Sequence, residues 1–329
     1  MNLFICTTPM QLILTCRIIE ETELLACNVH IFYISPIENK VVINTLNYAR
    51  KFSEKIDYLV INPKILNIYF FILLKKFFLK KYKSVYIASI NSIHIHFILT
   101  YIRFYELFTF DDGTANIFSG STYYVEHEYK SYIYRTLNKV RYSMLGIHYS
   151  KSKVKKTSLL HYTIYNGFSN IINNTFYIDF LQKKFDKSIN KSLDSKKRKC
   201  NVMLGSVYPD LFESEDSSQL YIERCFDYLK NTDKDTYYIP HPRNLLPIKA
   251  KGINIIESEN IAEFEIKLLL KKYDTIFLYG FMSSCQFNFL SDDRVINYFF
   301  YSNKVNDTYK HAMKDSSLIQ EFEVINIDY

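Results

Sequence analysis

Short apolar runs alternate with longer helical stretches along most of this chain, and that alternation limits the fold more than any other feature. In the first half, the runs typical of strands are 3–9, 29–35, 55–62, 84–90 and 105–113, and helical stretches such as 10–21 and 41–52 lie between them. Strands that alternate with helices predict a parallel sheet covered by helices. The first half is therefore expected to be an α/β domain.

A polar and charged stretch, FDKSINKSLDSKKRKC at 185–200, interrupts the alternation. After it the pattern restarts, with expected strands at 201–206, 236–243, 252–258, 274–284 and 294–302 and helices at 219–229 and 260–271. A chain of 329 residues suits roughly two domains of about 150 residues each. We therefore predict α/β domains at 1–185 and 200–329, joined by a linker at 186–199. A ligand-binding cleft is expected between the carboxyl ends of the two sheets.

Composition and cysteine spacing narrow the class of protein. Hydrophobic residues make up 48% of the chain, which is enough for packed cores and excludes a disordered chain. The six cysteines form no C-x-x-C pair and show no metal-ligand spacing, so we expect reduced thiols in a cytoplasmic protein. The opening LFICTTP lacks the basic segment and long apolar stretch of a signal peptide, which agrees with that expectation.

The segment 65–83, ILNIYFFILLKKFFLKKYK, interleaves lysines with apolar and aromatic residues. Its uncharged run at 65–74 is far shorter than the ~18–20 residues that a membrane-spanning helix needs. Two interpretations remain: a buried helix with a lysine-rich end, or a surface that contacts a membrane interface or a partner. We favour the second, because aromatic residues on nearly every side are hard to bury against one core.

Candidate ligand-binding residues stand at the ends of three of the expected strands of the second half. They are Gly205 and Ser206, then His241, Pro242 and Arg243, then Ser283 and Ser284. The chain has neither a G-x-G-x-x-G motif nor a Walker loop. Hydroxyls, an imidazole and a guanidinium at strand ends nevertheless suit a phosphate. Each motif alone also occurs in ordinary loops, but the three together predict a site for a phosphate-bearing ligand.

The expected strand at 105–110 runs into two adjacent carboxylates and a glycine, Asp111, Asp112 and Gly113. Adjacent like charges repel each other and cost stability, so their presence at a strand end indicates a functional role. The simplest alternative is a turn, because Asp caps turns and Gly supplies a positive φ.

Six motifs together resemble the bacterial lipooligosaccharide and capsule sialyltransferases of glycosyltransferase family 52. They are VYIAS at 85–89, TFDDGTANI at 109–117, HYTIYNGFSNI at 161–171, LGS at 204–206, PHPR at 240–243 and F-x-S at 281–283, in the family's order. The resemblance implies a GT-B fold, in which two Rossmann-like domains face each other across a cleft. It also implies transfer of sialic acid from CMP-sialic acid to a galactose-ended glycan, with inversion at the anomeric carbon and with neither a cofactor nor a metal.

The resemblance implies donor-side roles for the second domain. His241 is expected to face the phosphate of CMP and to donate a proton or a hydrogen bond to it. Arg243 adds charge nearby, or else serves a structural ion pair. Ser283 matches a phosphate-binding hydroxyl, whereas Ser284 stands where the family has Gly. The other residues expected on the donor side are Gly205, Ser206 and Pro242.

In the family, the catalytic base is a carboxylate that follows the Leu-Gly-Ser strand. Here LGSVYPDLFESED offers Asp210, Glu213, Glu215 and Asp216. We favour Asp210, because it comes first after the strand and a proline fixes the turn before it. The separation of 31 positions between Asp210 and His241 is longer than in the family, which indicates an insertion between them.

Asp111 and Asp112 are rivals for the role of base, because related sialyltransferase families carry it in a D-D-G motif. We expect the pair instead to line the acceptor side, where they bond sugar hydroxyls or hold the loop. The other residues expected on the acceptor side are Gly113, Thr114, Thr8 and Gln11. For Thr8 the alternative is a helix cap before Pro9. His161 is expected to be buried and bonded to backbone.

Two other functions stay open at this point. One is transfer from a UDP-hexose, since the same family label covers some glucosyltransferases, and the other is a non-catalytic, membrane-associated scaffold protein. The presence together of Asp111, His241, Arg243 and Ser283 argues against the scaffold. In the family, the stretch equivalent to 65–83 exchanges between two subunits and contacts lipid. We therefore expect a homodimer attached peripherally to the inner face of the cytoplasmic membrane, with no nucleic-acid partner.

Overall fold

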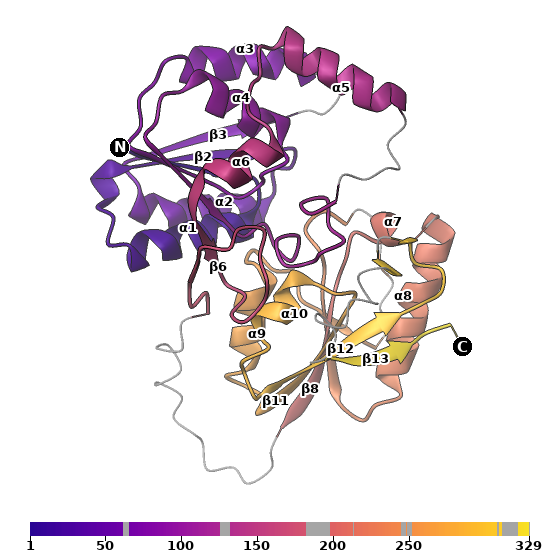
Figure 1. Cartoon of the computed structure of the whole chain (residues 1–329). Helices are drawn as coiled ribbons and strands as arrows, with labels where there is room; N and C mark the ends of the chain where they lie inside the picture. The colour runs from indigo at the N-terminus through magenta and orange to yellow at the C-terminus, as the bar shows by residue number, and fades with distance from the viewer. Residues whose placement is uncertain are drawn as a thin grey trace. The chain divides into compact units, whose positions relative to one another are not determined.

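The computed structural model describes residues 1–61, 66–125, 132–181, 198–212, 214–244, 248, 252–307, 309–310 and 322–328. The chain divides into two compact units, Met1–Phe180 and Leu181–Tyr329 (Figure 1). Ile65, Glu213 and most of the expected linker at 186–199 lie outside the described residues. The boundaries of that linker therefore stay a prediction.

Unit 1 is built on a seven-stranded sheet with the order β3-β2-β1-β4-β5-β6-β7, in which every pair of neighbours is parallel. The strands are β1 Asn2–Cys6, β2 Val29–Ser35, β3 Lys55–Val60, β4 Ser84–Ile87, β5 Glu106–Phe110, β6 Ser158–Thr163 and β7 Thr175–Tyr177. The helices are α1 Pro9–Glu21, α2 Lys40–Ala49, α3 Leu66–Phe77, α4 Ile93–Tyr101, α5 Tyr132–Met144 and α6 Lys151–Thr157. The strand order reverses between β1 and β4, which is where doubly wound sheets bind ligands.

Unit 2 repeats this plan in a six-stranded parallel sheet with the order β10-β9-β8-β11-β12-β13. The strands are β8 Lys199–Leu204, β9 Asp235–Ile239, β10 Asn254–Ile255, β11 Thr275–Gly280, β12 Val295–Tyr301 and β13 Glu323–Asn326. The helices are α7 Tyr208–Leu211, α8 Glu215–Lys230, α9 Ala262–Leu269 and α10 Ser284–Asn288. Here the order reverses between β8 and β11.

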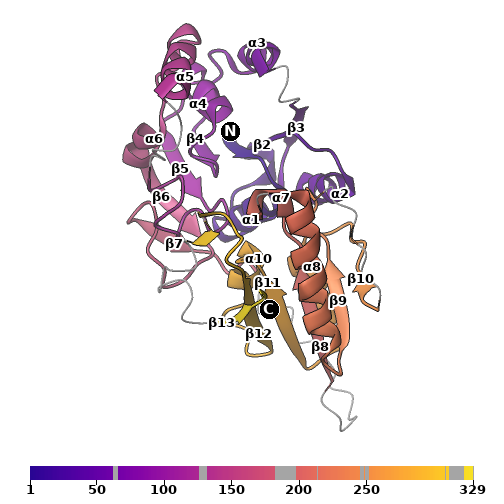
Figure 2. The ribbon, with the colours of Figure 1, turned by 90° about the vertical axis from the view of Figure 1, so that its right-hand side faces the viewer.

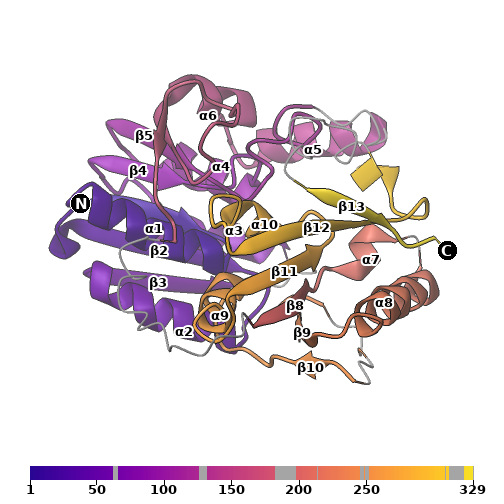
Figure 3. The ribbon, with the colours of Figure 1, turned by 90° about the horizontal axis from the view of Figure 1, so that it is seen from below.

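Helices cover both faces of each sheet. In unit 1, Phe70 of α3 and Ile98 of α4 share one buried core with Ile5 of β1, while α1 and α2 lie on the opposite face (Figure 2). In unit 2, Ile266 of α9 and Phe289, which follows α10, pack in one core, and α8 lies on the other face (Figure 3). These layers confirm the expected fold class at the level of the units: each has the strand order of a Rossmann-like domain.

Local sequence explains why the elements next to the carboxyl edge of the unit 1 sheet form. The strands β1 and β2 consist wholly of buried residues, as the central strands of parallel sheets do. The hydroxyl of Thr8 accepts a bond from the N–H of Gln11 at 3.3 Å, and Pro9 takes the first helical position of α1. Ser, Thr, Asp or Asn before a proline is a strong start signal for a helix. The capping alternative for Thr8 is therefore confirmed.

Candidate functional site

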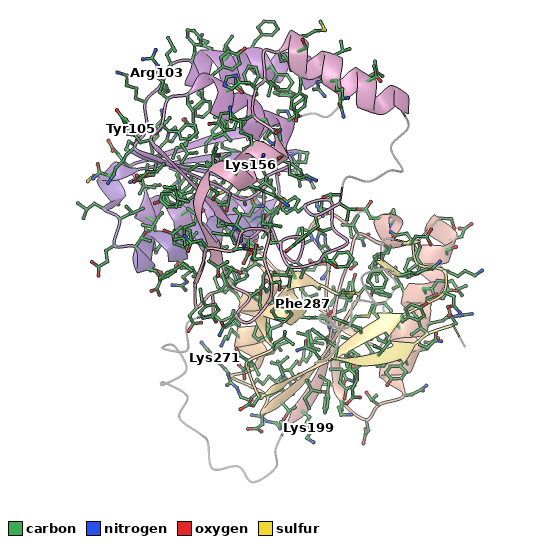
Figure 4. The ribbon with its side chains drawn as sticks, in the orientation of Figure 1. Arg103, Tyr105, Lys156, Lys199, Lys271 and Phe287 are labelled. Carbon is green, nitrogen blue, oxygen red and sulfur yellow. The ribbon has the colours of Figure 1, made fainter. Side chains whose placement is uncertain are left out.

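The expected site residues of each unit lie at the carboxyl edge of its sheet. Tyr105 and Lys199 mark the opposite, amino-terminal ends of β5 and β8 in Figure 4. In unit 2, Ser206 follows β8, His241 follows β9 and Ser283 follows β11. Because β9, β8 and β11 are neighbours in the sheet, the three donor-side motifs gather at one edge.

Gly205 is required by the close approach of two loops. A side chain here would place its Cβ only 2.6 Å from the backbone nitrogen of His241 and 2.6 Å from the hydroxyl of Tyr238. The N–H of Gly205 also donates to the carbonyl of Ile239 at 2.8 Å. The missing side chain therefore lets the loop that carries His241 pack directly against the end of β8.

The imidazole of His241 is oriented by its own loop. The backbone N–H of Arg243 donates to Nδ1 of His241 at 3.1 Å, so the neutral ring carries its proton on Nε2. Burial, and to a smaller extent the charge of Arg243, lower the pKa of His241 to about 4. At neutral pH the ring is therefore uncharged and offers one N–H donor, which suits a phosphate oxygen.

Arg243 and Asp210, the favoured charged candidates at this edge, are exposed, and so is the alternative acid Asp216 in α8. Within the described parts of the chain, no residue bonds the guanidinium of Arg243 or the carboxylate of Asp210. Asp210 lies in the first turn of α7, and its backbone carbonyl accepts a bond from the side-chain amide of Asn306. Of the other donor-side candidates, Pro242 is exposed and Ser206 is half-buried.

A strained turn presents the serines that follow β11. Met282 has a φ of 50°, in the left-handed region that residues with a side chain rarely adopt. The N–H of Ser283 donates to Oε1 of the buried Gln286 at 3.2 Å, and Gln286 donates in turn to carbonyls of β11 and β12. The turn is therefore fixed from beneath, while Ser283 and Ser284 stay half-buried.

In unit 1, the first carboxylate of the Asp-Asp-Gly motif is fully buried. Oδ1 of Asp111 accepts a bond from Nε2 of His161 at 2.9 Å, and Nδ1 of His161 lies 2.8 Å from the hydroxyl of Thr109. Oδ2 accepts bonds from the hydroxyl of Thr163 at 2.8 Å and the N–H of Ile164 at 2.6 Å. The motifs TFDDGTANI and HYTIYNGFSNI are thus linked by hydrogen bonds that join the ends of β5 and β6.

These contacts bear on two of the expected roles. Asp111 has no exposed surface, and both of its oxygens already accept bonds, so the geometry favours holding the loop over contact with a sugar. His161 is buried as expected. The expected backbone partner is wrong, because both ring nitrogens face side chains.

The second carboxylate is half-buried and is held by two side chains. Nε2 of Gln11 donates to Oδ1 of Asp112 at 2.5 Å and to the hydroxyl of Ser89 at 3.3 Å, and the hydroxyl of Tyr123 donates to Oδ2 of Asp112. Oε1 of Gln11 accepts bonds from the N–H of Thr7 at 2.6 Å and from its hydroxyl at 3.1 Å. We refer to these five residues as the Asp112 cluster. They come from the segments after β1, β4 and β5, on both sides of the point where the strand order reverses.

The environment of Tyr123 keeps it a donor. Burial, with the neighbouring Asp112, raises the pKa of Tyr123 well above its usual value, so the phenol stays protonated. Gly113 turns the chain directly after Asp112 with a φ of 62°, and the N–H of Asp112 donates to the side-chain oxygen of Asn116 at 2.7 Å. Gly113 and Thr114 are both half-buried beside the carboxylate.

Three residues of these two edges were not expected from the sequence: Ser89, Tyr123 and Gln286. Ser89 belongs to the motif VYIAS at 85–89, which resembles the family but to which no functional role was assigned. Tyr123 stands in a run of polar and aromatic residues with no motif around it. Gln286 carried a local signal, because Ser283 followed by Gln three positions later is a capping box.

The lysine-rich segment before β4 forms α3, whose surface is mixed. Phe70 and Phe77 are buried in the core of unit 1, so the expectation that the aromatic residues of this segment are hard to bury against one core is wrong for these two. Phe71 is 75% exposed and Phe78 is 55% exposed. Helical periodicity explains the difference, because one stripe of the helix faces the sheet. No helix within the described ranges is long and apolar enough to cross a membrane.

Comparison with known proteins gives the following similarities. The family described as glycosyltransferase family 52 matches residues 27–304. An N-acetyllactosaminide alpha-2,3-sialyltransferase of Haemophilus influenzae is 29% identical over 311 residues, 90% of each chain. A CMP-N-acetylneuraminate:beta-galactoside alpha-2,3-sialyltransferase of Pasteurella multocida is 30% identical over 271 residues, 80% of this chain and 79% of that one. Among solved structures, MurG of Acinetobacter baumannii matches with a TM-score of 0.45 and 8% identity, over 99% of this chain and 85% of that chain.

Proposed function

We propose, from the premise that this chain belongs to glycosyltransferase family 52, that it is a sialyltransferase. It would move sialic acid from CMP-sialic acid to the terminal galactose of a bacterial surface glycan, such as a lipooligosaccharide, an O-antigen or a capsule. The names of the relatives from Haemophilus influenzae and Pasteurella multocida support this substrate class. The structural observation that carries the proposal is His241, an uncharged N–H donor at the ligand edge of unit 2.

The donor would bind at the carboxyl edge of unit 2. The phosphate of CMP would accept bonds from Nε2–H of His241, from the guanidinium of Arg243 and from the hydroxyls of Ser283 and Ser284. As CMP departs, negative charge grows on its phosphate, and a donor already in position stabilises that charge. A bound anion also raises the pKa of a neighbouring imidazole, so the phosphate itself favours protonation of His241. General acid catalysis of this kind typically raises the reaction rate by about 10²–10⁴-fold.

We assign the base to Asp210. The acceptor hydroxyl must lose a proton when it attacks the anomeric carbon, and an exposed carboxylate that no described residue bonds is ready to accept it. Attack on the face opposite the departing CMP inverts the configuration at that carbon. The leaving group carries one phosphate rather than a diphosphate, so we propose that the reaction needs no metal.

The acceptor would bind at the carboxyl edge of unit 1. Asp112 is the reachable carboxylate there, with Gly113 and Thr114 beside it and Gln11 behind it. Carboxylate oxygens accept hydrogen bonds from sugar hydroxyls, as a galactose-ended acceptor would offer.

We further propose a cytoplasmic homodimer attached to the inner face of the membrane through α3. Phe71 and Phe78 are exposed, and exposed apolar side chains that gather on one surface normally mark an interface. The exposed lysines of the segment, Lys75, Lys80, Lys81 and Lys83, would face anionic lipid, at about 1 kcal/mol each. Lys76 is excluded, because it is paired with Asp57 at 2.8 Å.

The direct test is to incubate the protein with CMP-sialic acid and a panel of galactosides, with and without EDTA, and to measure released CMP. The proposal expects release that depends on a galactoside and is unchanged by EDTA. No release with any galactoside, together with turnover of a UDP-hexose, would overturn it.

A further inference from the structure

The Asp112 cluster has a reachable front and a buried back. Asp112 and Thr7 are half-buried, so a ligand can contact them. Behind them, Gln11 is 0% exposed, Tyr123 is 2% exposed and Ser89 is 7% exposed. Sites that must hold a ligand group in one orientation are usually built in this way, with a contacting layer locked by a supporting layer.

We infer that the Asp112 cluster is a subsite for an uncharged sugar, held through two neighbouring hydroxyls, and that Gln11 and Tyr123 are its positioning residues. The inference rests on the proposed function and makes it narrower. It adds that the galactose is held through two neighbouring hydroxyls, that a charged sugar is refused, and that Gln11 and Tyr123 fix the carboxylate that binds it.

The free lone pairs of Asp112 set the number of hydroxyls. An ionised carboxylate has about four acceptor sites, two on each oxygen. Gln11 occupies one site on Oδ1, and Tyr123 occupies one site on Oδ2. One site on each oxygen remains, and two such sites match the two hydroxyls of adjacent ring carbons.

The charge of the cluster sets the class of sugar. Asp112 is the single formal charge among its five members, because the others are an amide, two aliphatic hydroxyls and a protonated phenol. No lysine or arginine in the described ranges donates to any of the five side chains. A carboxylate in this setting attracts hydroxyl donors and repels a carboxylate or a phosphate. A glycan that already ends in sialic acid should therefore be refused.

The supporting side chains fix the orientation of the carboxylate. Gln11 uses its whole amide: its oxygen accepts from Thr7, and its nitrogen donates to Ser89 and Asp112. Tyr123 donates to the other oxygen, so rotation of the carboxylate would break bonds at both ends. Replacing Tyr123 with Phe would keep the buried ring and remove only that bond.

Direct binding of lactose, measured by saturation-transfer NMR without any donor, tests the subsite independently of turnover. We expect Tyr123→Phe to weaken lactose binding about tenfold, and Asp112→Asn to weaken it further. The matched control is Tyr124→Phe, because the hydroxyl of Tyr124 donates to the backbone carbonyl of Asn116 and not to Asp112. The control should bind lactose within about twofold of the wild type.

Kinetics with CMP-sialic acid supply the readout that a merely structural role would not move. Tyr123→Phe should raise KM for lactose about tenfold while KM for CMP-sialic acid and the affinity for CMP stay within about twofold. Sialylated lactose should neither bind nor react in the wild type.

The failures of the two proposals are distinguishable. If the wild type transfers sialic acid to lactose but the Tyr123 and Asp112 variants bind lactose normally, the subsite is wrong and the function stands. Equal use of lactose and sialylated lactose would overturn the preference for an uncharged sugar. If lactose binds in a way that depends on Asp112 but CMP-sialic acid is never consumed, the subsite stands and the function is wrong.

Discussion

Unit 1 and unit 2 carry the same strand order around the point where it reverses, yet the side chains gathered there differ in kind. Unit 1 presents a carboxylate held by neutral donors, with Asp112 at its centre. Unit 2 presents an uncharged imidazole, an exposed guanidinium and two hydroxyls, together with the exposed carboxylate of Asp210. The topology decides where the carboxyl edge of each sheet lies, and the side chains gathered there decide which chemical groups that edge can bond.

Both units use a buried glutamine behind the site, but they use it differently. Gln11 and Gln286 are both fully buried, and each stands in the first turn of the helix that follows a strand. Each accepts a bond from a backbone N–H of the preceding loop. Gln11 then donates to Asp112, whereas Gln286 donates to carbonyls of the sheet. The same device orients a side-chain carboxylate in unit 1 and a backbone turn in unit 2.

The largest expected effect separates the two carboxylates that compete for the role of base. Asp210→Asn keeps the size of the side chain and removes its basicity, so kcat should fall by about 10³-fold. Calorimetry should show that CMP still binds. The assignment is wrong if Asp112→Asn abolishes kcat at saturating lactose and Asp210→Asn does not, because the base would then lie in unit 1.

The next effect concerns the donor edge. His241→Ala removes the N–H donor that we assign to the phosphate, so kcat with CMP-sialic acid should fall by at least about 10²-fold. The thermal unfolding of the variant should match that of the wild type. Near-normal turnover would remove His241 from the mechanism and leave unit 2 without its central donor.

A third effect sharpens the contrast between the two neighbouring aspartates. Asp111→Asn disturbs a buried carboxylate that accepts bonds from His161, Thr163 and Ile164, so the free energy of unfolding should drop by about 2–3 kcal/mol. Asp112→Asn should cost about 1 kcal/mol or less, because Asp112 is half-buried. Urea unfolding followed by circular dichroism measures both. Equal losses would contradict the division into a structural and a ligand-facing acid.

The smallest expected effect tests a surface of unit 1. Phe71→Ser with Phe78→Ser should weaken binding to anionic vesicles roughly tenfold, about 1.4 kcal/mol, and leave stability almost unchanged. The matched pair Phe70→Ser with Phe77→Ser should instead destabilise the fold, because both rings are buried. Flotation with vesicles at low salt measures the first effect. A wild type that sediments as a monomer and ignores such vesicles would refute the interface.

The sequence predicted both sheets because uninterrupted apolar runs mark buried parallel strands, as in β1 and β2. It did not predict β6, because SLLHYT mixes polar and apolar residues, and the strand is recognised only through its pairing with β5. In the same way, the sequence did not predict a role for Tyr123, because that role depends on a contact with Asp112 across a loop. The contact between Gln11 and Asp112 spans 101 positions of the chain, and no local pattern encodes such a distance.

The division of labour between the units can be tested with one titration. CMP is titrated by calorimetry into the wild type, His241→Ala and Asp112→Asn. The account predicts that the wild type and Asp112→Asn bind CMP within about twofold of each other, and that His241→Ala binds it at least about tenfold more weakly, which corresponds to about 1.4 kcal/mol. Loss of CMP binding in Asp112→Asn, with full binding in His241→Ala, would place the CMP-binding site on unit 1 and contradict the account.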